Sequence, residues 1–193
     1  MGKASGKTKT AVVNGQEIPA QAVQFELDRL VKFYANHGVS AEDVRKSLDI
    51  LREKALEQAI GAKLLLDRAS QLDLPVTAAD IDREVAKVVE QVGGEGRYRE
   101  ALAAQGLSED AFRRELEKGA RVDMLVEQAC AHVQDPTEDE VAAFYEANKS
   151  SWGSQTLVDA HDRIKDLLRH EARGRAMDLF IEELRESATI EYK

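Results

Sequence analysis

The sequence predicts a mainly α-helical fold, closed by a small pairing of β-strands from the two ends of the chain. Apolar residues recur at spacings of three and four through most of the 193 residues. Charged residues make up 33% of the chain and there are only 3 prolines, a composition that favours long helices over a β-sandwich. Strand-favouring residues stand near both ends, at Val12 and Val13 and again at Ile190 and Tyr192. Strands this short are unstable alone, so we expect them to pair and to bring the termini together.

The first forty residues divide into a tail, a strand and a helix. Residues 1–10 are rich in glycine, serine and lysine, which is typical of a disordered or tag-like tail. A strand is expected at residues 11–13, and the Asn14-Gly15 pair that follows favours a tight turn. A helix then begins near Pro19, which suits a first helical turn, and ends at Gly38, which suits the position after a last turn.

Capping signals divide the middle of the chain into further helices. A serine or threonine with an acid three residues later marks a helix start. We interpret three such pairs as helix starts: Ser40 with Asp43, Thr77 with Asp80, and Thr137 with Glu140. We expect one long helix from Ser40 to the residues before Pro75, and because it is apolar on two sides we expect neighbouring helices to enclose it. Glycines at 93–96 and at Gly106 end the next two helices, and Ser108 begins another.

The last helix is expected after the stretch SSWGSQ, residues 150–155. This stretch is the least helical run in the second half of the chain, and it contains the only tryptophan, Trp152. After it, small or large apolar residues recur at every fourth position from Ala160 to Ala188. The sequence therefore predicts a loop at 150–155 between two helices.

Composition excludes several classes of partner. The net charge of −9, with no basic patch beyond the tail, argues against nucleic acid. No apolar run approaches the roughly 20 residues of a membrane span, so no membrane insertion is expected. No apolar segment follows the lysines of the tail, so no signal peptide is expected at this N-terminus. Cys130 is the single cysteine, which rules out an internal disulfide, and its apolar helical neighbours predict a buried thiol.

No catalytic, metal or cofactor site is predicted. The four histidines have no metal-ligand spacing: His37, His132, His161 and His170. The glycines at 93–96 follow a helix rather than a strand and precede no Lys-Ser or Lys-Thr pair, so a phosphate loop is not expected. Acidic pairs such as Glu138-Asp139, and the histidines at 161 and 170, are interpreted as solvated positions on charged helix faces.

Five segments, in order, resemble the chaperone part of the SurA-type and parvulin-type foldases, which are bacterial export chaperones. The first is VVNGQEI at 12–18, before a helix. The second and third are ALEQAIGAKLLLDRASQLDLPVTAADIDREVAKV at 55–88 and YREALAAQGLSEDAFRRELEKGARVDMLVEQ at 98–128. The fourth, PTEDEVAAFYEANK at 136–149, is similar to the lead into the family's isomerase domain. The fifth, TLVDAHDRIKDLLRHEARGRAMDLFIEELRESATIEY at 156–192, is similar to its closing helix and strand.

The resemblance implies a domain organisation with one part missing. Such proteins usually carry a parvulin prolyl isomerase domain of roughly one hundred residues between the fourth and fifth segments. Here only residues 150–155 stand between them, and the paired histidines and the Gly-Gly-Asp-Leu-Gly-like loop of a parvulin are missing. We therefore expect a helical chaperone domain at 11–149, a short join at 150–155, and a helix and strand at 156–193 that complete the same domain.

The function implied by the resemblance is chaperone activity without ATP, in which unfolded or exported client polypeptides are bound as a holdase or foldase. The family implies a location in the periplasm or cell envelope, whereas the N-terminus without a signal peptide leaves a cytoplasmic location as the alternative. Strand pairing between the chain ends also invites a domain-swapped homodimer, because a terminal strand and helix can exchange between two copies. No cofactor is expected, and no enzyme activity is expected of this chain.

Two other functions stay open. The chain is a non-catalytic remnant or deletion derivative of a parvulin-type peptidyl-prolyl cis-trans isomerase, or it is a helical adaptor for one specific protein partner. Suppression of aggregation of several unrelated clients distinguishes a chaperone from an adaptor.

Aromatic side chains on more than one side of a helix indicate where clients would bind. A core helix needs only one apolar stripe, so at least one aromatic residue in each such helix should be available to a client. Aromatic rings bury much area with few rotatable bonds, which suits weak and unspecific capture. The expected peptide-binding residues on these helices are Phe25, Phe33, Tyr34, Phe144 and Tyr145. Trp152 is added to them because it stands beside the join, where the missing domain would leave it uncovered.

Overall fold

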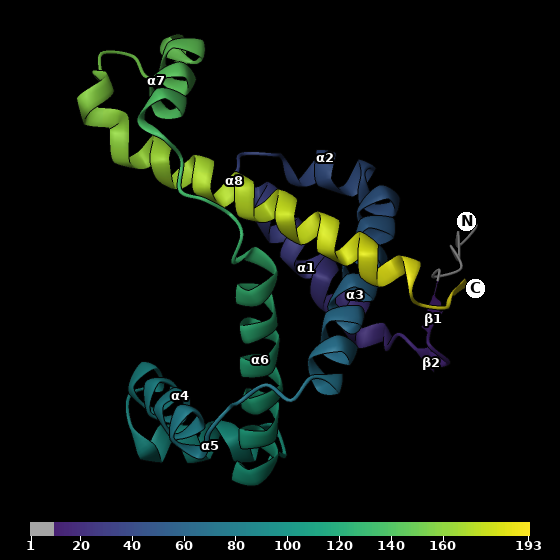
Figure 1. Cartoon of the computed structure of the whole chain (residues 1–193). Coiled ribbons are helices and arrows are strands. Elements are labelled where there is room, and N and C mark those ends of the chain that lie inside the picture. The colour runs from purple at the N-terminus through teal and green to yellow at the C-terminus, as the bar shows by residue number, and fades with distance from the viewer. Residues whose placement is uncertain (1–9) are drawn as a thin grey trace. The chain divides into compact units, whose positions relative to one another are not determined.

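The structure is a computed structural model that describes residues 10–193, and the predicted tail at 1–10 lies outside this part except for Thr10. The chain divides into two compact units, which we describe separately. The first comprises the residues up to Val122 together with Glu183–Lys193, and the second is Asp123–Glu182. Helices dominate both units, as the composition predicts (Figure 1).

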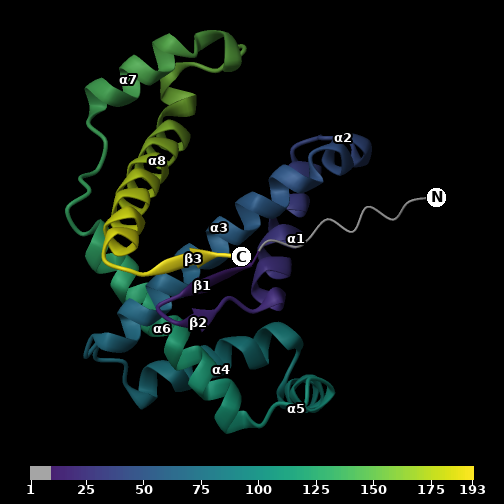
Figure 2. The same ribbon diagram turned by 90° about the vertical axis from the view of Figure 1, so that its right-hand side faces the viewer.

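Strands from the two ends of the chain form one antiparallel sheet with the order β2-β1-β3. Strand β1 is Ala11–Val13, β2 is Gln16–Glu17 and β3 is Ile190–Tyr192, and Figure 2 shows them side by side. In β1 and β3, Val13 lies opposite Ile190. This arrangement confirms the predicted pairing of the chain ends, here within one chain. The strand β2 was not predicted, because two residues are too few to show alternation.

The turn between β1 and β2 forms because its two residues accept positive φ angles. Asn14 has a φ of 49° and Gly15 a φ of 79°, the conformation that a two-residue hairpin requires. Asn14 also joins the hairpin to the other end of the chain. Its backbone N–H donates to the Thr189 carbonyl at 2.9 Å, and its side-chain Oδ1 accepts from the Thr189 N–H at 3.0 Å.

The core of the first unit lies between the sheet and three helices. These are α1 at Ala20–Asn36, α2 at Ala41–Lys46 and α3 at Leu48–Gln71. Its buried members are Ala11, Val13, Ile18, Val23, Leu27, Val44, Leu51, Ala55, Leu56, Ala59, Ile60 and Leu64. The partly buried Leu184, Ala188 and Ile190 pack against it from the end of the chain. Helix α3 therefore lies at the centre of a core, as its two apolar sides predict.

One long helix from Ser40 to the region before Pro75 was predicted. This prediction was wrong, because the segment forms two helices with a break at Ser47. Ser47 has φ −94° and ψ 5°, and it separates α2 from α3. Its N–H is shared between the carbonyls of Asp43 and Val44 at 3.1 and 3.2 Å, a pattern common at helix ends. Serine competes with the helix backbone for hydrogen bonds, which explains why the break falls there.

A second hydrophobic cluster forms among α4 (Ala78–Val92), α5 (Glu95–Ala104) and the first half of α6 (Glu109–Cys130). Its buried members are Ile81, Val85, Tyr98 and Leu102. The predicted helix break occurs at Gly93, where φ is 90°. Apolar burial in this cluster joins the three helices, and an ion pair between Arg113 of α6 and Asp82 of α4 at 2.7 Å adds to it.

The second unit contains the end of α6, the helix α7 (Glu138–Ala147), a short 3-10 turn at Lys149–Ser151 and most of α8 (Leu157–Glu186). Reciprocal capping boxes begin α7, between Thr137 and Glu140, and α8, between Thr156 and Asp159. No helix among residues 10–193 has the length and apolarity to cross a membrane.

We predict that Ile190→Ala lowers the free energy of unfolding by about 1 to 2 kcal/mol, less than a fully buried isoleucine would cost. Ile190 is partly buried against the first core and lies opposite Val13, so its loss should also speed amide exchange at Val23 and Leu27 in α1. Urea unfolding and hydrogen exchange measure the two effects. Glu191→Ala, at the exposed neighbouring position, is the control, and equal effects of both variants would refute the role of this pairing.

Candidate functional site

Helix α1 exposes two of the six predicted aromatic residues. Val23 and Leu27 turn one side of the helix into the core, so Phe25 and Phe33 lie on other sides. The exposed fraction is 62% for Phe25 and 53% for Phe33. Tyr34 is half-buried and packs against the first core. Two large apolar side chains are therefore available on one helix.

The Phe33 ring lies in a small aromatic group at the end of α1. Its centroid is 4.1 Å from that of His37, with an angle of 32° between the rings, and it meets Tyr34 edge to face at 5.6 Å. The Nδ1 atom of His37 lies 2.7 Å from the Phe33 carbonyl oxygen. These contacts restrict the Phe33 ring while leaving half of it exposed, so little entropy is lost when a partner covers it.

The three aromatic residues around α7 pack in the second unit. Tyr145 is 7% exposed, and its hydroxyl donates to the Gln155 carbonyl at 2.8 Å. Phe144 and Trp152 are partly buried against the same cluster, whose buried members are Val141, Tyr145, Ala160 and Ile164. The burial of Tyr145 assigns it to the core, and we leave it out of the client-binding surface proposed below. Phe144 and Trp152 offer only their exposed edges.

The stretch 150–155 forms a tight connection around Trp152. Gly153 has a φ of 57°, and the Gln155 N–H donates to the Trp152 carbonyl at 3.0 Å. The Arg163 guanidinium lies 5.6 Å from the centroid of the Trp152 ring, a cation–π distance. These contacts join α7 to α8 without any inserted domain.

Further exposed apolar residues lie outside the predicted set. They are Val39, Ile50, Leu66, Leu107, Val158, Leu167, Leu179 and Tyr192. The exposure of two of them could have been predicted from the sequence. Leu167 and Leu179 fall outside the series of apolar residues at every fourth position from Ala160 to Ala188. Single exposed apolar residues are common on protein surfaces, so we assign no binding role to these.

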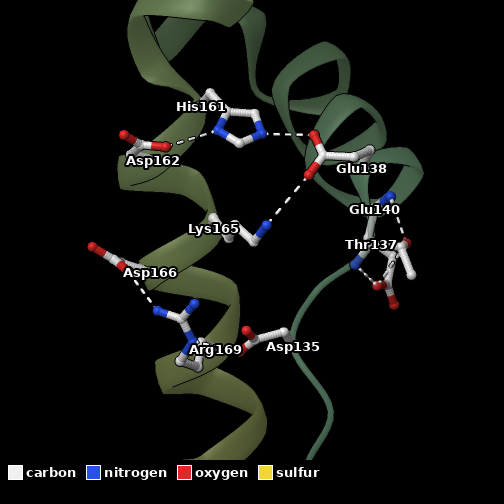
Figure 3. Close-up of polar contacts among 9 residues, drawn as sticks. All are labelled: Asp135, Thr137, Glu138, Glu140, His161, Asp162, Lys165, Asp166 and Arg169. Atoms are coloured by element: carbon white, nitrogen blue, oxygen red, sulfur yellow. Dashed lines mark hydrogen bonds and ion pairs between the residues drawn. The ribbon is translucent and has the colours of Figure 1, made fainter.

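A row of ion pairs connects α8 to α7, to the segment before α7 and to the end of α6, and sequence reasoning missed it. Four basic residues lie four apart along α8, on one face: His161, Lys165, Arg169 and Arg173. Figure 3 shows that Glu138 bridges His161 and Lys165, with distances of 2.7 Å to Nε2 and 3.3 Å to Nζ. Two further pairs continue the row, Arg169 with Asp135 at 2.7 Å and Arg173 with Glu127 at 2.6 Å.

We call these seven residues the ionic row. His161 was interpreted as a solvated position, and its side chain is 29% exposed with both ring nitrogens in contact with carboxylates. Hydrogen bonds from His161 and Lys165 lower the pKa of Glu138, and the Arg169 guanidinium lowers the pKa of Asp135. Hydrogen bonds to Asp162 and Glu138 raise the pKa of His161. The regular spacing of basic residues was the available signal.

Cys130 is buried, as predicted, and lies 3.8 Å from the Arg173 carbonyl oxygen. Among the residues that the structure describes, no group of three or more histidine, cysteine, aspartate or glutamate side chains is arranged to hold a metal ion.

Comparison with solved structures identifies the fold. One match is a chain from the structural work on the virulence factor PEB4 and the periplasmic protein Cj1289 of Campylobacter jejuni, two structurally related SurA-like chaperones, and its TM-score is 0.60. The match covers 95% of this chain and 98% of that chain at 15% sequence identity, so it establishes a shared fold. The fold is that of a SurA-like chaperone.

Sequence comparison identifies the family. Residues 1–128 match the SurA-like N-terminal domain, and the chain therefore belongs to this family. The foldase protein PrsA of Clostridium perfringens is 23% identical over 157 residues, which cover 77% of this chain and 45% of that protein. The chaperone SurA of Methylobacillus flagellatus is 29% identical over 103 residues, which cover 53% of this chain and 24% of that protein.

The resemblance inferred from the sequence is thus confirmed at the level of family and fold. The chain spans less than half of the length of the two curated relatives that it matches. Within the described residues, α7 and α8 are joined by a short turn, and the short join expected from the sequence at 150–155 lies in it.

We predict that Tyr145→Phe destabilises the second unit by about 0.5 to 1.5 kcal/mol, the usual net worth of one hydrogen bond. The variant keeps the buried ring and removes only the bond to the Gln155 carbonyl. Thermal unfolding followed by Trp152 fluorescence measures the change, because Trp152 packs on the same cluster. Tyr34→Phe, on α1, is the matched control. An unchanged transition in Tyr145→Phe would show that the bond contributes nothing.

Proposed function

We propose that this chain binds unfolded segments of client polypeptides without ATP, as a holdase or foldase domain. The observation that carries the proposal is the exposure of Phe25 and Phe33 on α1 in a chain of the SurA-like N-terminal domain family. Exposed aromatic rings provide apolar area for an extended segment, and their few rotatable bonds keep the entropic cost of binding low. The partly buried Tyr34, Phe144 and Trp152 contribute their exposed edges.

The charge of the chain supports a chaperone in two ways. A net charge of −9 keeps the protein soluble with apolar side chains exposed. The negative charge also favours clients with basic or neutral segments, and it repels the phosphates of nucleic acid. The clients are therefore proposed to be polypeptides that expose aromatic or aliphatic residues.

Location and assembly are part of the proposal. One of the two Campylobacter jejuni chaperones behind the structural match, Cj1289, is a periplasmic protein, which supports a periplasmic or other cell-envelope location for this chain. The pairing of β1 with β3 closes within one chain here, and its exchange between two copies stays a prediction.

Two other functions are the alternatives to this proposal. An adaptor for one partner would leave unrelated unfolded proteins to aggregate. The other alternative is a non-catalytic remnant or deletion derivative of a parvulin-type isomerase, whose catalytic domain would stand between α7 and α8, where only a short turn joins the two helices. We propose that this chain is not an isomerase.

We predict that Phe25→Ser and Phe33→Ser each weaken the suppression of client aggregation by roughly two- to tenfold, the loss expected for one aromatic contact. Light scattering of two unrelated unfolded clients measures it. Because both rings are mostly exposed, the melting temperature should change by less than about 3 °C.

Lys32→Ser, at the exposed position beside Phe33, is the matched control and should keep full activity. Activity per folded molecule that is intact in both phenylalanine variants would remove α1 from the client-binding surface.

We predict that the chain does not accelerate cis/trans exchange of an X-Pro bond in a short peptide. The uncatalysed exchange takes tens of seconds or longer at 25 °C, so catalysis would be easy to detect. A protease-coupled or NMR exchange assay with a parvulin as positive control measures it. A rate that rises in proportion to the concentration of this chain would contradict the prediction.

A further inference from the structure

The ionic row joins α7 to α8 with polar contacts that add to a small apolar cluster between the two helices. Helix α7 has 10 residues, and an isolated helix of this length is marginal in water. It places two buried residues, Val141 and Tyr145, against Ala160 and Ile164 of α8. Phe144 is partly buried against the same cluster, and the Tyr145 hydroxyl donates to the Gln155 carbonyl. The polar contacts of Glu138 and of the preceding Asp135 with α8 add to this attachment. A small change in these contacts therefore shifts the balance between attached and detached α7.

The two hydrogen bonds of the His161 ring require a protonated imidazole. Its Nδ1 lies 2.9 Å from Asp162 Oδ1, and its Nε2 lies 2.7 Å from Glu138 Oε2. Both partners are carboxylate oxygens, which only accept hydrogen bonds. An imidazolium donates from both nitrogens, whereas a neutral imidazole donates from one and presents a lone pair at the other. The geometry in Figure 3 thus fits the charged ring alone.

We propose that the attachment of α7 to α8 is graded by pH through the proton on His161. With the proton present, the ring bridges Asp162 of its own helix and Glu138 of α7. Without it, one of the two carboxylates loses its donor, and the local Asp162 competes with Glu138 for the single N–H that remains. The proposal concerns the conformation of the chain itself and stands whether or not clients bind.

The charged groups around His161 set the direction of the effect. Glu138 faces it from α7, and Asp162 and Lys165 stand beside it on α8. Of the other two acids in the first turn of α7, Glu140 bonds to Thr137 in the helix cap, as Figure 3 shows, and Asp139 is exposed. Lys165 also holds Glu138, so loss of the proton weakens the attachment without abolishing it.

The sign follows from the pKa directions. The pKa of His161 is raised above 6.5, so its contribution is complete below that pH and is lost as the pH rises through the raised value. The pKa of Glu138 is lowered below 4.5 and that of Asp135 below 3.8, so their contributions are complete above pH 4.5 and are lost as the pH falls. Attachment is strongest between pH 4.5 and pH 6.5.

Amide hydrogen exchange of the whole chain at about pH 5.5 and about pH 8.5 tests the proposal. Rates are corrected for the intrinsic exchange of an unstructured peptide, and α4, in the other unit, serves as the internal reference. The protection of α7 should fall by roughly two- to fivefold at the higher pH, the scale of one exposed ion pair. The protection of α4 should stay constant over the same interval.

Two variants and a matched control test whether the pH dependence of α7 protection comes from His161. His161→Gln keeps a donor toward Glu138 but does not titrate, so α7 protection should become independent of pH in this interval. His170→Gln, the same change at an exposed position nine residues further along α8, should behave like the unchanged chain. Glu138→Gln removes the partner across the helices, so it should reduce the pH effect and lower the midpoint of the His161 titration measured by NMR.

The proposal is overturned if α7 protection does not fall between the two pH values, or if the fall is the same in His161→Gln. Circular dichroism shows whether each variant keeps its helices. If His161→Gln fails to fold, the NMR midpoint in Glu138→Gln decides, because an unchanged midpoint would show that Glu138 does not hold the proton.

Discussion

The antiparallel pairing of β1 with β3 is the contact on which the first unit depends. It places Val13 and Ile190 in one core with the apolar sides of α1 and α3, although they lie at opposite ends of the sequence. Arg185, near the end of α8, bonds to Glu57 of α3 at 2.7 Å and strengthens the same closure. Helix α1 turns Val23 and Leu27 into the same core, which leaves Phe25 and Phe33 outside it. The proposed function thus follows from a structural constraint on α1.

Much of this architecture was predictable because it depends on local signals. Capping pairs placed the starts of α4 and α7, and the Asn14-Gly15 turn and the strand-favouring ends predicted the sheet. The break at Ser47 was missed because an apolar stripe continues across it, and β2 was missed because it has two residues. Neither feature leaves a periodic pattern in the sequence.

The aromatic residues show the limit of sequence reasoning for a binding surface. Five were predicted from their placement on more than one side of a helix, and Trp152 from its place beside the join. Burial separates them: Phe25 and Phe33 are exposed while Tyr145 is in a core. The ionic row was missed because its acids come from three different places, the end of α6, a loop and the start of α7, so only the basic half has a regular spacing. Contacts between elements explain both outcomes, since charge patterning alone does not give the partner of a side chain.

Site-specific photocrosslinking tests most directly the claim that the outward face of α1 binds clients. A crosslinking amino acid is placed at position 25 or 33, and at position 170 as an exposed site on another helix. The account predicts that an unfolded client crosslinks at 25 and 33, that crosslinks at 170 are weak, and that the same client in its folded state crosslinks at none of them. Equal yields at all three positions, or no crosslinks at 25 and 33 while aggregation is suppressed, would contradict it.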